Sequence, residues 1–108
     1  RQNDIVIIAV AGRLDAMTAP QLTAQLTAAL ARGDRKFVVD CHALEYLSSG
    51  GLRAFFAFGQ QLPADGGLAF AAPDPNVRKV MAMVELDRDF AVVADTAAAI
   101  SALRAPGD

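Results

Sequence analysis

Short apolar runs alternate with amphipathic stretches along this chain, a pattern that predicts strands alternating with helices. Residues 5–10 form a continuous apolar run rich in β-branched side chains and ended by Gly12, which is typical of a strand covered on both faces. Leucines at every fourth position over 22–30 predict a helix that begins with Thr18 as its cap and stops at Gly33.

The alternation continues with a second strand at 37–39 and a connection at 40–46 that carries Leu44 and Tyr46 back into the core. A second helix is expected to open at 48–51 and to end near Pro63. Its apolar face is predicted to contain Leu52, Phe55, Phe56, Gly59 and Leu62. Three phenylalanines so close together cannot all face inward, so we expect Phe58 at the surface or under a loop.

The last part of the chain predicts a third strand at 68–71 and a helix capped by Asp74. The buried face of that helix is predicted to comprise Val77, Val80, Met81 and Val84. A fourth strand at 90–93 and a final helix capped by Asp95 complete the pattern. The fourth strand is short, and it fits either a parallel strand or an antiparallel edge strand.

This order predicts an α/β fold, a single domain over residues 1–108 with a mostly parallel sheet of about four strands and four helices. In such a sheet, ligands and partners usually bind where the parallel strands end. Chain order places three segments at that edge, 12–18, 45–51 and 72–76, and we expect them to be neighbours in space.

Composition and charge exclude several classes of function. The chain has 108 residues, and its 10 basic against 12 acidic side chains give a net charge of −2, so a nucleic-acid-binding protein is not expected. One cysteine and one histidine cannot form an internal disulfide or a usual zinc ligand set, and we predict no cofactor. No apolar run approaches the roughly 20 residues that span a membrane, so we expect a cytoplasmic protein, and the missing initial methionine suggests part of a longer one.

Ser48 and Ser49 stand where a strand passes into a helix, which invites comparison with the nucleophile elbow of serine hydrolases. That motif needs glycine two residues before and two residues after the nucleophile, but Leu47 and Gly51 flank Ser49 at those positions. His42 is the one candidate base, and no base–acid pair accompanies it in the pattern. A hydrolase is therefore the least favoured reading.

The Ser49-Gly50-Gly51 sequence at a helix start offers free N–H groups to an anion, yet it lacks the P-loop lysine and the G-x-G-x-x-G spacing of nucleotide sites. A phosphate carried by Ser49 itself is compatible with this position and would make a nearly neutral surface negative. The alternative is that Ser49 is only an N-cap. Asp15 also allows two interpretations. Its carboxylate either accepts hydrogen bonds within its own turn or presents a negative charge to a partner.

Three segments of the chain resemble the STAS domains of bacterial anti-sigma-factor antagonists. Residues 12–20 are similar to the first signature of that family, residues 44–53 to the loop that bears its regulatory serine, and 77–103 to its closing helix-strand-helix. The resemblance implies a protein that binds a kinase-type anti-sigma factor and is released when the kinase phosphorylates one serine, which a PP2C-type phosphatase reverses. By position, Ser49 is the acceptor, with Ser48 as the alternative. The expected partner surface comprises Asp15, Ser48, Ser49, Gly50, Gly51 and Arg53.

The sequence departs from the family pattern at two positions beside the acceptor. Ser48 stands where the family often has aspartate, and Gly50 where it often has serine, threonine or alanine. The family usually has an extra antiparallel strand before the one at Ile5, which here is missing or cut short. A second hypothesis therefore stays open, a STAS module of a transporter or sensory complex that docks a partner ATPase without being phosphorylated.

Overall fold

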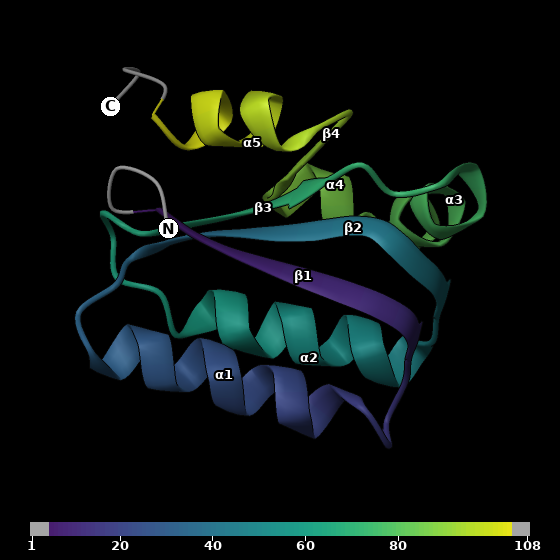
Figure 1. Ribbon diagram of the computed structural model, residues 1–108, viewed down its shortest axis with the longest axis horizontal. Helices are drawn as coiled ribbons and strands as arrows, with labels where there is room; N and C mark the ends of the chain where they lie inside the picture. The colour runs from purple at the N-terminus through teal and green to yellow at the C-terminus, as the bar shows by residue number, and fades with distance from the viewer. Residues whose placement is uncertain (1–4, 105–108) are drawn as a thin grey trace.

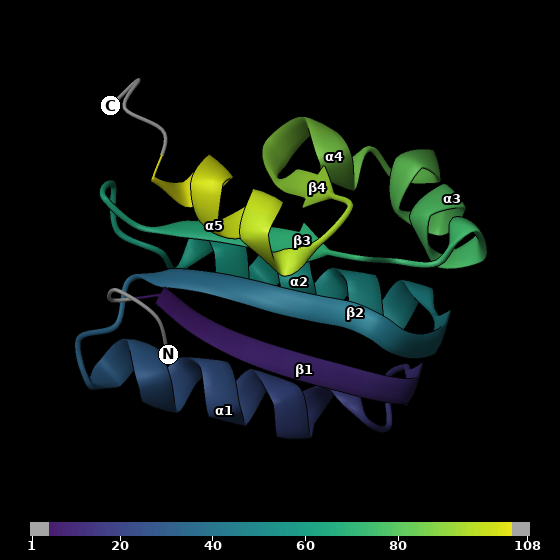
Figure 2. The same cartoon turned by 45° about the horizontal axis from the view of Figure 1, so that its top comes forward.

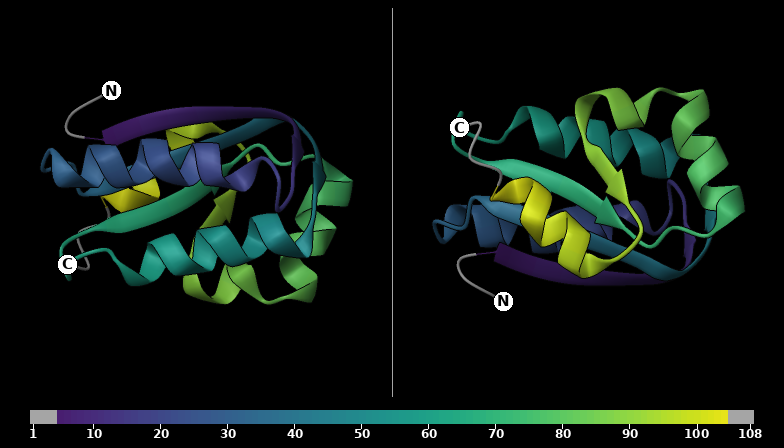
Figure 3. Two further views of the ribbon diagram at one scale, coloured as in Figure 1. Left: turned by 90° about the horizontal axis from the view of Figure 1, so that it is seen from below. Right: turned by 90° about the horizontal axis from the view of Figure 1, so that it is seen from above.

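The computed structural model describes residues 5–104 and shows a four-stranded sheet, ordered β1-β2-β3-β4, with helices on both faces (Figure 1). Along the chain the elements are β1 (Ile5–Leu14), α1 (Ala19–Ala31), β2 (Lys36–Leu47), α2 (Ser49–Gln60), β3 (Gly67–Ala71), α3 (Pro75–Met83), α4 (Leu86–Asp89), β4 (Ala91–Val93) and α5 (Thr96–Leu103). Helices α1 and α2 run side by side under one face of the sheet, and α5 covers the other (Figures 2 and 3).

The predicted α/β fold with a parallel sheet is confirmed. All three strand pairs are parallel, including β3 with β4, where Phe70 pairs with Val92, so the fourth strand is not antiparallel. The predicted number of helices is wrong, because residues 5–104 contain five rather than four. The additional helix is α4, which follows directly after Glu85 adopts a left-handed conformation with φ of 61° and ends the preceding helix.

Strands β1 and β2 are both longer than the apolar runs predict. Segment 40–46, expected as a connection, belongs to β2, and β1 continues through Gly12. Two register shifts accommodate this pairing, and Gly12 takes a positive φ of 71° beside one of them, which costs glycine little. Since β3 pairs only as far as Asp40 with Ala71, the ends of β1 and β2 extend beyond the rest of the sheet.

Aromatic packing forms the core between the sheet and helices α1 and α2. Phe58 is fully buried and meets Phe37 edge to face at 5.2 Å between ring centroids, which corrects its predicted surface position. Phe58 lies three residues after the buried Phe55, so the two share one helix face, and Phe56 is the partly exposed ring.

Two other residues predicted in the core are exposed. Tyr46 is 43% exposed, because the irregular end of β2 turns both Glu45 and Tyr46 outward between the buried Leu44 and Leu47. Val84 is 44% exposed, because α3 ends one residue earlier, at Met83.

The capping predictions hold for two helices. The Asp74 side chain accepts a hydrogen bond from the Val77 N–H, and Asp95 accepts one from Ala98, each at 2.8 Å. The expectation that the family's extra strand before Ile5 is missing or cut short concerns residues outside the described part of the chain. Within residues 5–104, no helix is both long and apolar enough to cross a bilayer.

Close packing fixes the start of α2 against the ends of β1 and β2. A Cβ atom on Gly51 would lie 2.8 Å from the Leu14 carbonyl oxygen and 3.0 Å from a methyl group of Leu47. The first turn of α2 can therefore take this position only with glycine at residue 51.

We predict that Gly51→Ala lowers the free energy of unfolding by about 1–3 kcal/mol, because the added methyl group displaces the Leu14 backbone. Urea unfolding measures this loss. Ser49→Ala is the matched control in the same turn, and as an exposed substitution it should change stability by no more than about 0.5 kcal/mol. Equal stabilities for wild type and Gly51→Ala would show that the packing is looser than the structure indicates.

Candidate functional site

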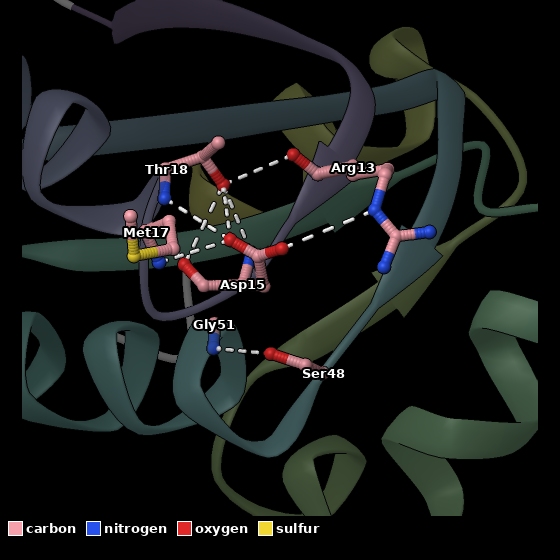
Figure 4. Close-up of polar contacts among 6 residues, drawn as sticks. All are labelled: Arg13, Asp15, Met17, Thr18, Ser48 and Gly51. Carbon is pink, nitrogen blue, oxygen red and sulfur yellow. Dashed lines mark hydrogen bonds and ion pairs between the residues drawn. The ribbon is translucent and has the colours of Figure 1, made fainter.

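The turn between β1 and α1 is built around the carboxylate of Asp15 (Figure 4). Its Oδ1 atom accepts hydrogen bonds from the Met17 N–H at 2.9 Å and the Thr18 N–H at 3.1 Å. The Thr18 hydroxyl accepts from the Asp15 N–H at 2.9 Å and donates to the Arg13 carbonyl at 3.0 Å. Thr18 was expected to cap α1, but its hydroxyl closes this turn and makes no capping hydrogen bond.

These hydrogen bonds hold the Asp15 carboxylate in its charged form. The pKa of Asp15 lies below the usual 3.8, chiefly because the Met17 N–H donates to the carboxylate, with smaller contributions from Thr18 and from the charge of Arg13. The Nε atom of Arg13 lies 3.9 Å from Oδ2 of Asp15. The guanidinium carbon of Arg13 also stacks 4.2 Å from the ring centroid of Tyr46, so the turn and the end of β2 share one arginine.

Ser48 and Ser49 have different roles at the start of α2. Ser48 is the N-cap, since its Oγ accepts a hydrogen bond from the Gly51 N–H at 3.3 Å and its backbone N–H donates to the Leu14 carbonyl at 3.0 Å. Ser49 is the first helical residue and is exposed, whereas Ser48 is partly buried. The expected alternative, with Ser49 as the cap, is therefore wrong by one residue.

Gly50 brings the β1–α1 turn into contact with α2. A Cβ atom on Gly50 would lie 2.9 Å from both the Cβ and the backbone nitrogen of Ala16, the residue after Asp15. Two of the three segments predicted to be neighbours, 12–18 and 45–51, thus touch. The third segment, 72–76, leaves the sheet opposite Asp40 rather than at Leu47, because β3 is much shorter than β2.

Arg53 is exposed on α2, four residues after Ser49. It also lines a groove of about 650 Å³ between α1 and α2. The other lining residues are small or apolar: Ala16, Ala19, Pro20, Thr23, Ala24, Thr27, Gly50, Ala54 and Ala57. The groove thus begins at the contact between Gly50 and Ala16.

The structure gives no support to a serine nucleophile. The Nδ1 atom of His42 lies 3.1 Å from Oδ1 of Asp40, so this histidine does have a carboxylate partner. Within residues 5–104, however, His42 makes no hydrogen bond to Ser48 or Ser49, as a general base would. Burial raises the pKa of the Cys41 thiol to about 12, so it stays protonated and unreactive at neutral pH.

Three residues at this edge were not among the predicted site residues, namely Arg13, Met17 and Tyr46. Met17 is 88% exposed in the β1–α1 turn, next to the Asp15 carboxylate. A large apolar side chain within a polar turn is a sequence signal for such a residue. Tyr46 gave no such signal, since its apolar ring fits a core position equally well.

Two known proteins of related sequence are described as anti-sigma factor antagonists. The chain is 35% identical over 77 residues to BtrV of Bordetella bronchiseptica, a match that covers 70% of this chain and 66% of that protein, just under two thirds of it. The crystal structure of an anti-sigma factor antagonist from Mycobacterium paratuberculosis matches with a TM-score of 0.89 and 28% identity, over 96% of this chain and 89% of that one.

More distant structures share the fold alone. SpoIIAA in its unphosphorylated form matches with a TM-score of 0.73 and 22% identity, over 97% of this chain and 94% of that one. A sulfate transporter family protein from Wolinella succinogenes matches with a TM-score of 0.74 and 11% identity, over 94% of this chain and 86% of that one. The same fold therefore occurs both in an anti-sigma factor antagonist and in a sulfate transporter family protein, the two kinds of protein considered from the sequence.

The family comparison covers most of the chain. Residues 1–94 match the family model described as "Mlab, STAS domain". This span includes the first two of the three segments quoted from the sequence, the β1–α1 turn with Asp15 and the start of α2 with its two serines, and most of the third, 77–103. The chain belongs to the STAS-domain family.

Proposed function

We propose that this chain is an anti-sigma-factor antagonist, a binding module rather than an enzyme, that docks a kinase-type anti-sigma factor and is released when that kinase phosphorylates Ser49. The proposal rests on one observation, the different structural roles of Ser48 and Ser49. Ser48 is engaged as the helix cap, and Ser49 presents its side chain to solvent beside the Asp15 turn. The antagonist relatives supply the class of partner.

Ser49 is a better acceptor than Ser48 on physical grounds. A kinase must bring the hydroxyl within reach of a nucleotide phosphate, which requires an exposed side chain. Phosphate on Ser48 would also disturb the hydrogen bond from the Gly51 N–H that starts α2. Phosphate on Ser49 leaves that cap in place, and the positive end of the helix favours an anion there by about 0.3–1 kcal/mol.

The charge added by phosphorylation would weaken binding of the partner rather than change the fold of this chain. A phosphoserine carries about −1.5 to −2 charges at neutral pH. The whole chain carries a net charge of −2, so one modification would nearly double that net charge and would concentrate the change near the ionised Asp15. A partner that accepts the neutral hydroxyl then meets a dianion, and like charges across an interface cost several kcal/mol.

The proposed partner surface is the edge formed by the β1–α1 turn and the first turns of α2. It comprises Asp15, Ser48, Ser49, Gly50, Gly51 and Arg53, together with Arg13, Met17 and Tyr46. Exposed methionine and aromatic side chains beside charged groups suit a protein interface. A PP2C-type phosphatase would reverse the modification, and the cytoplasm would supply the ATP.

The alternative is a STAS module that docks an ATPase through the same edge and is never phosphorylated. The fold match to a sulfate transporter family protein and the replacement of the expected aspartate by Ser48 favour it. The two functions differ in one observable, the transfer of phosphate to Ser49.

We predict that an anti-sigma kinase encoded beside this gene transfers one phosphate from ATP to the chain, detected by intact mass. Ser49→Ala should abolish the transfer and Ser48→Ala should retain it, because the Ser48 hydroxyl serves the cap and not the kinase. Tight binding without any added phosphate would refute the switch and support the alternative function. Phosphate on Ser48 alone would refute the assignment of the acceptor.

We predict that Ser49→Asp weakens partner binding at least about tenfold, because it places a negative charge at the interface. Ser49→Ala should bind like wild type, since it removes only an exposed hydroxyl that makes no hydrogen bond to another residue of 5–104. Isothermal titration calorimetry with the purified partner measures both affinities. Equal affinities for the two variants would contradict the electrostatic account.

We predict that Asp15→Asn unfolds at lower urea than wild type at pH 7, and that the difference disappears in acid. The pKa of Asp15 is lowered in the folded state, so its charged form stabilises the fold above its unfolded pKa, and this contribution is lost as pH falls through the lower folded value. Urea midpoints at pH 7 and at a pH well below 3.8 test this. A pH-independent difference would show that the asparagine disturbs the turn by shape rather than by charge.

A further inference from the structure

We propose that Arg53 binds the phosphate carried by phosphorylated Ser49 and so fixes where the added charge stands. The inference rests on the proposed function, because it concerns the modified form of that acceptor. It deepens the proposal by assigning a residue that positions the phosphate.

The helix places the two side chains together. Ser49 is the first residue of α2 and Arg53 follows four residues later in the same helix. Side chains at that spacing share one face, with Cβ atoms about 5–6 Å apart. An anion that lies four residues before a cation is the more favourable of the two orders. Both residues are exposed, so neither needs to leave the core to meet the other.

Arg53 is available, unlike several other arginines of the described chain. Arg13 lies beside Asp15 and over the ring of Tyr46, Arg35 pairs with Asp65, and Arg88 pairs with Glu85. Among the ion pairs of residues 5–104, none involves Arg53. Its guanidinium would therefore not have to break an ion pair within residues 5–104 in order to bind the phosphate.

A guanidinium is well suited to bind a phosphate. The planar fork of N–H donors can bind two phosphate oxygens at once, and the charge on both groups strengthens the hydrogen bonds. Of the three residues between Ser49 and Arg53, Gly50 and Gly51 have no side chain and Leu52 is buried, so none of them competes for the phosphate.

The pair would hold the phosphate on the side of α2 that faces the β1–α1 turn. Arg53, Gly50 and Ala16 all line the groove between α1 and α2, and Gly50 lies against Ala16. The phosphate dianion would then be held near Ala16 and the neighbouring Asp15 instead of moving freely in solvent. Arg53 therefore directs the negative charge onto the proposed partner surface.

The test uses the full chain with phosphoserine inserted at position 49 during translation, so that no kinase is needed. The second pKa of the phosphate, ordinarily about 6, is read by phosphorus NMR titration. We expect it to be about 0.3 unit higher in Arg53→Gln than in wild type, the size of a helical ion pair four residues apart. Arg53→Lys should fall between them, because it keeps the charge but loses the fork.

Arg32→Gln is the matched control, since it removes the same charge from an exposed position at the far end of α1. Its phosphate should titrate like that of wild type. An unchanged pKa in Arg53→Gln, or an equal rise in both glutamine variants, would overturn the inference. Because the phosphate is supplied by synthesis, this result is independent of whether a kinase modifies Ser49, and the two proposals fail separately.

Discussion

The contact between the end of β1 and the first turn of α2 is the constraint on which the rest of the site depends. The Leu14 carbonyl accepts the Ser48 N–H, and there is no room for a Cβ atom on Gly50 or Gly51 because Ala16 and Leu14 lie against them. This contact decides which serine caps the helix and which faces solvent. A shift of one residue along α2 would make Ser49 the cap and Gly50 the first helical residue, so the packing of the two glycines leaves the Ser49 side chain exposed.

Near the Ser49 hydroxyl, the negative charge of Asp15 is offset by the positive charge of Arg13. Asp15 stays ionised because backbone N–H groups of its own turn donate to it, and Arg13 bridges it to the ring of Tyr46. At physiological salt, charges more than about 8 Å apart in solvent are largely screened. The proposed phosphate at Ser49 would therefore act on groups near this edge and leave the far side of the sheet unaffected. One modification can control one interface without remodelling the fold.

The sequence predicted the order of elements and the parallel sheet, because apolar runs and helix starts such as Asp74 and Asp95 are local signals. It did not predict the length of β2, where pairing with β1 carries polar residues such as Glu45 into a strand. It placed Tyr46 in the core, and one of its two interpretations made Ser49 rather than Ser48 the N-cap, since each error amounts to one residue of register. The site was predictable as a region, because parallel strand ends share an edge, but its hydrogen bonds depend on packing between distant segments.

The fold alone does not choose between an antagonist and a transporter module, so the choice rests on the residues at this edge. Ser48 stands where the resemblance leads one to expect aspartate, yet both residue types cap helices well, and the Ser48 hydroxyl accepts the Gly51 N–H. The replacement keeps the structural role and removes one negative charge beside the acceptor. The unmodified surface is then less negative, and if Ser49 is phosphorylated as proposed, the same added charge of about −1.5 to −2 acts on a surface that starts closer to neutral. The departure from the family pattern thus preserves the cap and is compatible with the proposed electrostatic switch at Ser49.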